Sequence, residues 1–155
     1  MFRINIICVG KNKDKWIDDA IEHYSKLLKK YAVITFDYIP TNKLSKAVSA
    51  DELSNLESDL ISKRLKTRFQ IALSERGKSV DSIGFSKWLA QIMKRSGASD
   101  IIIGGINGLD KSFLKSCDEI ISLSPMTMSH QLVRPVLLEQ LYRAFSIISG
   151  GKYHR

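Results

Sequence analysis

The sequence predicts a single α/β domain over residues 1–155, in which helices flank a mostly parallel sheet. Segments rich in apolar and β-branched residues alternate along the chain with segments whose apolar residues recur every three to four positions. The opening segment, residues 2–9, is apolar almost throughout, which is typical of a strand buried on both faces of a parallel sheet. No repeat or linker interrupts the pattern, and the length is enough to bury one core.

The first part of the chain is expected to alternate between strands and helices. Residues 2–9 form the first strand, and residues 14–30 carry apolar residues at helical spacing, with Asp14 as a candidate cap. Residues 33–39 alternate and contain β-branched and aromatic residues, which predicts the second strand. Leucines at helical spacing predict a second helix over residues 50–65.

The middle of the chain continues this order. A short third strand is expected at residues 69–73, and the polar composition of residues 74–79 predicts a loop. Asp81 or Ser82 is a candidate cap for a third helix, whose apolar positions extend to Met93.

Two further strands and a short helix follow. The fourth strand is expected at residues 100–103 and leads into a glycine-rich turn at residues 104–108. Asp110 then caps a helix that ends near Cys117, and residues 119–123 form the fifth strand.

The last helix is predicted over residues 131–148, with Pro135 in its first turn, where a proline removes no helical hydrogen bond. In open parallel sheets, ligands bind beyond the carboxyl ends of the strands. Three segments leave strands at that edge, at residues 74–79, 104–108 and 124–129. We therefore expect them to line one crevice.

Two features of these segments are compatible with a ligand, and each has a structural alternative. The segment Gly104-Gly105-Ile106-Asn107-Gly108 matches neither the dinucleotide fingerprint nor the phosphate-binding P-loop. Its paired glycines either let a ligand approach the backbone closely or only form a tight turn. Met126 and Met128 either form an apolar floor for a flat ring or fill the core.

Charge and composition restrict the function classes. The 24 lysines and arginines against 16 acidic residues give a net charge of +8, which favours polyanionic partners such as nucleic acid. Residues 61–68 contain four basic residues and no acid, and form either a solvated helix face or a basic contact surface. The two cysteines and three histidines do not stand at metal-ligand spacing, so no metal is predicted. No apolar run is long enough for a membrane span, and a cytoplasmic location is expected.

The chain ends in Gly-Gly-Lys-Tyr-His-Arg, a polar segment without an acidic residue. Terminal segments of this kind usually fray. If this one is ordered, Tyr153, His154 and Arg155 place a phenol, an imidazole and a guanidinium side by side. Such a set can hold a phosphate or a base and move a proton, so the tail is a candidate part of a site.

Several motifs taken together resemble one family. They are the Gly-Gly-x-x-Gly-Leu turn, the Ser-Leu-Ser-x-Met-Thr loop, the Leu-x-Glu-Gln-Leu-Tyr-Arg-Ala helix and the terminal Tyr-His-Arg. The combination resembles the bacterial large-subunit ribosomal pseudouridine N3-methyltransferases, which are small members of the SPOUT class. The resemblance covers the whole chain, including the Val9-Gly10-Lys11 end of the first strand.

The resemblance implies an α/β fold with a trefoil knot at its C-terminal end and S-adenosylmethionine bound within the knot. It also implies a homodimer in which the tail of one subunit completes the site of the other. The reaction would methylate N3 of a pseudouridine in 23S ribosomal RNA. Because the chain has no room for a separate RNA-binding domain, the expected substrate is the assembled ribosome, held in part by Lys63, Arg64, Lys66 and Arg68.

The resemblance also implies individual site residues. The residues that match the cofactor pocket are Leu73, Gly104, Gly105, Leu123, Ser124, Pro125, Met126, Thr127 and Met128. The residues that match positions near the target base are Arg143, Tyr153, His154 and Arg155. As a hypothesis, His154 or a water that it holds removes the N3 proton, and Arg143 or Arg155 stabilises the anionic ring.

Two positions depart from the family pattern. Ser129 stands where the family commonly has proline, which is expected to loosen the cofactor loop, and Pro135 is expected to shift the start of the last helix. Two other function classes stay open, namely an α/β enzyme acting on a small nucleotide or phosphate ester and a non-catalytic RNA-binding module. Binding of S-adenosylmethionine distinguishes the methyltransferase from both.

Overall fold

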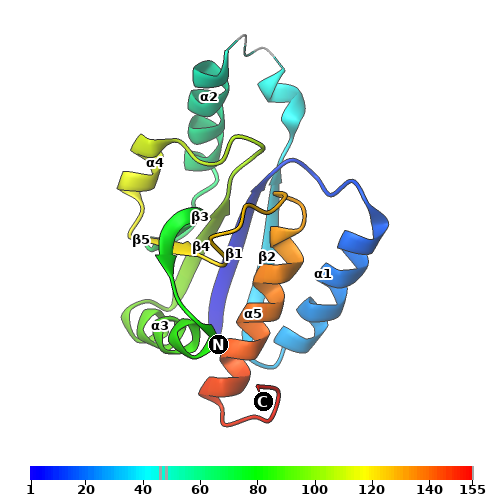
Figure 1. Cartoon of the computed structure of the whole chain (residues 1–155), viewed down its shortest axis with the longest axis vertical. Coiled ribbons are helices and arrows are strands. Elements are labelled where there is room, and N and C mark those ends of the chain that lie inside the picture. The colour runs from blue at the N-terminus through cyan, green and yellow to red at the C-terminus, as the bar shows by residue number, and fades with distance from the viewer. Residues whose placement is uncertain (46, 48, 155) are drawn as a thin grey trace.

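A computed structural model describes residues 1–45, 47 and 49–154. Its centre is one parallel sheet with the strand order β2-β1-β4-β3-β5 (Figure 1). The strands are β1 (Phe2–Val9), β2 (Ala32–Ile39), β3 (Gln70–Ser79), β4 (Ala98–Ile103) and β5 (Glu119–Ser122). The helices are α1 (Lys15–Leu28), the 3-10 helix η1 (Thr41–Leu44), α2 (Ala50–Ser62), α3 (Ser82–Arg95), α4 (Lys111–Ser116) and α5 (Val133–Ile148). The predicted α/β fold with a parallel sheet is confirmed.

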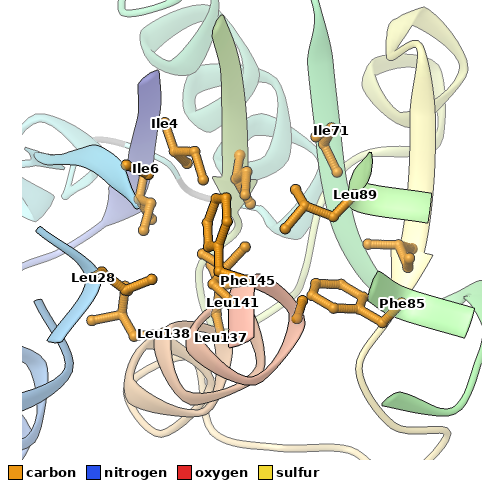
Figure 2. Packing of buried hydrophobic residues seen from close by; sticks show 14 of the residues in the cluster. Ile4, Ile6, Leu28, Ile71, Phe85, Leu89, Leu137, Leu138, Leu141 and Phe145 are labelled. Carbon is orange, nitrogen blue, oxygen red and sulfur yellow. The ribbon is translucent and has the colours of Figure 1, made fainter. Parts of the chain in front are cut away.

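Helices cover both faces of the sheet. Ile6 of β1 belongs to the apolar cluster that includes α1, α3 and α5, whereas its neighbour Ile7 belongs to the cluster that includes α2, η1 and α4. Figure 2 shows Leu137, Leu141 and Phe145 of α5 projecting into the first cluster. Side chains of a strand alternate between the two faces of its sheet. Both faces are covered here, which explains why β1 is apolar almost throughout.

The segment 74–79 corrects one expectation, because it belongs to β3 and is not a loop. Beyond Leu73 the pairing of β3 with β5 shifts in register and resumes at Lys78. Such an irregularity keeps a strand in the sheet while it bends. Gly77 permits the close passage, since a Cβ atom there would lie 2.7 Å from the backbone of Ile121.

Aspartates at helix starts act as caps at two of the three candidate positions. The Asp81 carboxylate accepts a hydrogen bond of 2.7 Å from the Gly84 N–H, so Asp81 rather than Ser82 caps α3. Asp110 accepts from two N–H groups in the first turn of α4. Asp14 occupies the cap position of α1, but its side chain makes no capping bond with the described residues.

The last helix, α5, begins at Val133, two residues later than predicted, and Pro135 lies in its first turn as expected. The Ser129 hydroxyl accepts hydrogen bonds from the N–H groups of Gln131 (3.2 Å) and Leu132 (3.3 Å). These N–H groups precede the helix and would otherwise need water or another partner. Ser129 thereby ties the preceding loop to the start of α5.

No helix in the described part of the chain combines the length and apolar character needed to cross a membrane. The trefoil knot implied by the resemblance stays a prediction.

Candidate active site

A cavity of about 910 Å³ lies where β4 and β5 end and where β3 bends. All three segments predicted to form a crevice contribute to its walls. Every residue predicted to bind the cofactor lines the cavity, with the exception of Pro125. The structure therefore brings these residues together, and their role in binding stays a prediction.

The glycines of the turn after β4 contribute bare backbone to one wall of this cavity, beside Ile106 and Asn107. A Cβ atom on Gly104 would lie 2.9 Å from the Gly108 carbonyl carbon, and one on Gly105 would overlap the Glu57 carboxylate. Gly108 has a φ of 71°, a left-handed conformation that favours glycine. Its N–H donates a 3.0 Å hydrogen bond to the Gly105 carbonyl. The segment is thus a tight turn, and it also leaves bare backbone facing the cavity.

The loop between β5 and α5 is held against β3 by a side-chain hydrogen bond. The Thr127 hydroxyl donates to the Glu75 carboxylate at 2.9 Å, and the Ser124 hydroxyl accepts from the Met126 N–H at 3.0 Å. The Met126 side chain is 76% exposed, so it does not fill the core, and Met128 is half-buried. Glu75 was missed by the sequence reasoning because its segment was expected to leave the sheet.

The residues predicted near the target base lie at the other end of α5. Gly150, with a φ of 71°, ends the helix and turns the chain back along it. The Tyr153 hydroxyl donates to Glu139 Oε1 at 3.2 Å. Arg143 donates to the same oxygen from Nε (3.1 Å) and Nη2 (2.6 Å), and its Cζ lies 4.7 Å from the centre of the Tyr153 ring. The structure thus brings Arg143 and Tyr153 together around Glu139.

Electrostatics set the protonation states of this group. Burial raises the pKa of Tyr153 to about 12, and hydrogen bonding with Tyr24 and the nearby Glu139 charge act in the same direction. The hydrogen bond to Glu139 raises the pKa of Arg143. Tyr153 is therefore a neutral hydrogen-bond donor near neutral pH, and Arg143 is a fixed cation.

Glu139 is a further candidate that the sequence reasoning did not single out. Its carboxylate accepts from both Arg143 and Tyr153 and so sets the position of each. The signal that could have found it is the spacing of four residues between Glu139 and Arg143, which places them on one helix face.

His154 and Arg155 complete the predicted set. The His154 Nδ1 atom is buried and has no hydrogen-bond partner among the described residues, which is unusual for a buried polar atom. Arg155 lies outside the described residues.

Within one chain, the tail and the cavity are separate. Val133, the first residue of α5, lines the cavity, whereas the tail follows the last residue of the helix (Figure 1). The tail turns back along α5 as far as Glu139, which follows Val133 by six residues, or about 9 Å along the helix. Among the described residues, neither Arg143, Tyr153 nor His154 lines the cavity. Residues 1–45, 47 and 49–154 contain no group of three or more His, Cys, Asp or Glu side chains that could hold a metal.

Comparison with known proteins agrees with this architecture. A family model described as "Predicted SPOUT methyltransferase" matches residues 2–154. The chain is 38% identical over 158 residues to the ribosomal RNA large subunit methyltransferase H of Lactobacillus helveticus, covering 98% of this chain and 99% of the relative. It is 39% identical over 157 residues to the protein of the same name from Nitratiruptor sp., covering 100% of both.

Solved structures show the same fold at low sequence identity. A methyltransferase-type protein from Bordetella pertussis superposes with a TM-score of 0.58 at 13% identity, covering 93% of this chain and 96% of that one. A methyltransferase-type protein from Legionella pneumophila, solved with the bound cofactor SAM, gives a TM-score of 0.53 at 11% identity, covering 92% and 66%. The family match and the full-length relatives are decisive: the chain belongs to the SPOUT methyltransferase family.

Proposed function

We propose that this protein transfers a methyl group from S-adenosylmethionine to N3 of a pseudouridine in large-subunit ribosomal RNA. The relatives that match over their full length are named ribosomal RNA large subunit methyltransferases. The observation that carries the proposal is the cavity in which the bare glycine turn after β4 faces the loop of residues 123–128. A cavity lined by this turn and by residues 123–128 favours a methyltransferase over the two alternatives, a phosphate-ester enzyme and a non-catalytic RNA-binding module.

The cavity fits S-adenosylmethionine in size and chemistry. Its volume lies within the usual range for small-molecule sites. Leu73 and Leu123 offer apolar surface to a flat purine, and Gly104 and Gly105 leave their backbone open to close approach. When bound, the cofactor supplies an electrophilic methyl group. The chain's residues hold it and orient it, with Thr127 fixed by Glu75.

The tail residues carry the proton chemistry in this proposal. N3 of pseudouridine becomes a good nucleophile only when its proton is lost. His154, or a water that it holds, accepts that proton, and Arg143 or Arg155 stabilises the negative charge on the ring. Tyr153 orients Arg143 through their shared partner Glu139.

The active unit in the proposal is a homodimer, with the tail of one subunit at the cavity of the other. Its support is the separation between tail and cavity within one chain and the unpartnered Nδ1 of His154. Exposed apolar side chains on or beside α1 and α5 are also compatible with a subunit contact, namely Trp16, Leu132 and Ile148. Each chain forms one catalytic domain.

The substrate in the proposal is the assembled ribosome, which places the protein in the cytoplasm. Arg64 and Lys66 form ion pairs with Asp37, at 2.5 Å and 3.3 Å, so these two cations are partly committed within the fold. Lys63 and Arg68 are exposed. This small basic surface suits a preformed RNA assembly better than recognition of an isolated hairpin.

Methyl-labelled S-adenosylmethionine and ribosomes that lack the modification provide the test. We expect label on N3 of one large-subunit pseudouridine, and loss of transfer when residues 153–155 are deleted. The cofactor affinity of the deletion variant should stay unchanged. Transfer to neither ribosomes nor free ribosomal RNA would refute the activity, and equally efficient methylation of a short hairpin would refute the assembled substrate.

A further inference from the structure

A second cavity, of about 610 Å³, adjoins the cofactor cavity and has no role in the reaction described above. Its walls come from the loop after β1, from the segment after β2 and from α2. Gly105, Ile106 and His130 line both cavities. The glycine turn is therefore a shared wall, and a ligand in the second cavity lies next to the cofactor cavity.

The loop after β1 is fixed in place by a buried side chain. Arg134 is fully buried and donates from Nη2 to the carbonyl oxygens of Val9 (2.8 Å) and Gly10 (3.0 Å). Its Nη1 donates to Asn12 Oδ1 at 2.6 Å. Hydrogen bonds to a guanidinium are stronger than those between neutral groups, so this wall is preorganised.

The Gln131 side chain also holds the loop after β1, through hydrogen bonds to the loop backbone and none to the lysine side chains. Gln131 Nε2 donates to the Lys11 carbonyl at 3.0 Å, and Gln131 Oε1 accepts from the Lys13 N–H at 3.3 Å. The Lys11 and Lys13 side chains are exposed and form no ion pair with the described residues. Both lysines line the cavity, so its rim is basic.

Two titratable groups besides the lysines, His130 and Glu57, line the second cavity, and neither cancels the charge at the rim. Burial lowers the pKa of His130, and the nearby Arg134 and Lys13 lower it further, which keeps the imidazole neutral. Glu57 is buried, and its carboxylate accepts the Gly105 N–H, so it serves the turn rather than the basic rim.

The rest of the lining suits a flat base. Apolar surface comes from Val9, Pro40, Leu44, Leu53 and Ile106. An apolar pocket with cations at its rim matches an unstacked nucleotide, whose base is flat and whose phosphate is anionic. An acidic peptide would meet the same cations and the polar side chains of Asn12, Thr41 and Asn42, but it carries no flat base for the apolar walls.

We propose that the second cavity holds an unstacked nucleotide of the RNA substrate, with Lys11 and Lys13 contacting its phosphates. The proposal rests on the methyltransferase function, because it assigns the part of the chain that presents RNA to the cofactor cavity.

The test compares two double variants that lose the same charge. Lys11→Ala/Lys13→Ala removes the rim cations, and the hydrogen bonds of Gln131 to the backbone remain. Lys87→Ala/Lys94→Ala removes two exposed lysines of α3, which line neither cavity. For each variant and the wild type, the dissociation constants for ribosomes and for S-adenosylmethionine are measured over a range of salt concentrations, together with turnover.

We expect the rim variant to bind ribosomes about tenfold more weakly and to lose about two units of the slope of log affinity against log salt. Cofactor affinity should stay within about twofold, and the α3 variant should match the wild type within the same range. Equal weakening in both variants would show a net-charge effect and overturn the proposal. So would unchanged ribosome affinity, or a loss of cofactor affinity, which would assign the cavity to the cofactor.

Ribosome binding also separates this proposal from the function on which it rests. If the wild type transfers no methyl group but binding weakens only in the rim variant, the proposed reaction fails and the nucleotide cavity stands. If the wild type methylates ribosomes and the rim variant binds them normally, the reaction stands and the cavity assignment fails.

Discussion

Arg134 at the start of α5 donates a 2.8 Å hydrogen bond to the carbonyl oxygen of Val9 at the end of β1, across 125 positions of sequence. The guanidinium is fully buried and forms no ion pair with a described carboxylate. Its charge is balanced instead by oxygen acceptors and by the Tyr38 ring, whose centre lies 5.6 Å from Cζ. This contact anchors the first strand to the helix that follows the cofactor loop.

Replacing Arg134 with methionine should lower the free energy of unfolding by about 2 to 4 kcal/mol, because buried carbonyl groups would lose charged donors. Urea unfolding followed by circular dichroism measures the change. Arg3→Met is the matched control, since Arg3 is exposed and its replacement should alter stability by less than about 0.5 kcal/mol. A loss at Arg134 no larger than the control would show that the buried contact contributes little.

Replacing Gly104 with alanine should weaken binding of S-adenosylmethionine about tenfold or more. The added Cβ would lie 2.9 Å from the Gly108 carbonyl carbon, so the backbone of the turn must move. Calorimetry measures the affinity, and thermal unfolding shows whether the fold is retained. Gly97→Ala is the control, because a Cβ there meets no atom within 4 Å. Unchanged affinity in Gly104→Ala would remove this turn from the cofactor site.

The sequence predicted the fold well where burial determines the pattern. β1 was predicted at its observed bounds because both of its faces are covered, and α3 was predicted because its apolar residues recur at helical spacing. The extension of β3 was missed because residues 74–79 are polar. A glycine at position 77 lets this segment pass close to β5, and that contact is set by tertiary structure rather than local propensity.

The candidate site was predictable in part for a similar reason. Loop residues such as Gly104 and Thr127 gather at one sheet edge because parallel strands end there together. The contact of Tyr153 with Glu139 depends on a chain reversal at Gly150, and the bond between Thr127 and Glu75 depends on the bend in β3. No local pattern encodes either contact.

Stability should fall at alkaline pH because of Cys8, which is buried in β1. Burial raises the pKa of this thiol from 9.0 to about 12. The contribution of the protonated thiol is therefore complete below pH 9 and is lost as the pH rises toward 12, where the unfolded chain ionises first. The free energy of unfolding of the wild type exceeds that of Cys8→Ala most below pH 9. At pH 10.5 this difference should be smaller by about 2 kcal/mol.

Urea unfolding of both proteins between pH 8 and 11 measures this difference. Cys117 is present in both proteins, as are all lysines and tyrosines, so their titration cancels in the comparison. A stability difference that stays constant over this range would show that Cys8 ionises in the folded protein as readily as in the unfolded chain.

Mixing two impaired variants should restore activity if the tail acts on the partner's cavity, with S-adenosylmethionine kept well below the dissociation constant of the Gly104→Ala variant so that its altered cavities stay largely empty. One variant carries Gly104→Ala, and the other lacks residues 153–155. Each heterodimer then has one site with an intact turn and an intact tail, and random assortment gives about a quarter of wild-type turnover. If each tail served its own cavity, no intact site would form.

The reverse mixture gives the control. A chain that carries both changes is mixed in equal amounts with the wild type, so that every heterodimer contains one intact and one doubly altered chain. With tails acting across the dimer, both sites of that heterodimer are defective, and total turnover falls to about a quarter; with tails acting within one chain, it falls only to about half. Turnover near half, with heterodimers verified by native mass spectrometry, would place the tail in its own subunit's site and leave the unpartnered Nδ1 of His154 to a water or to the RNA.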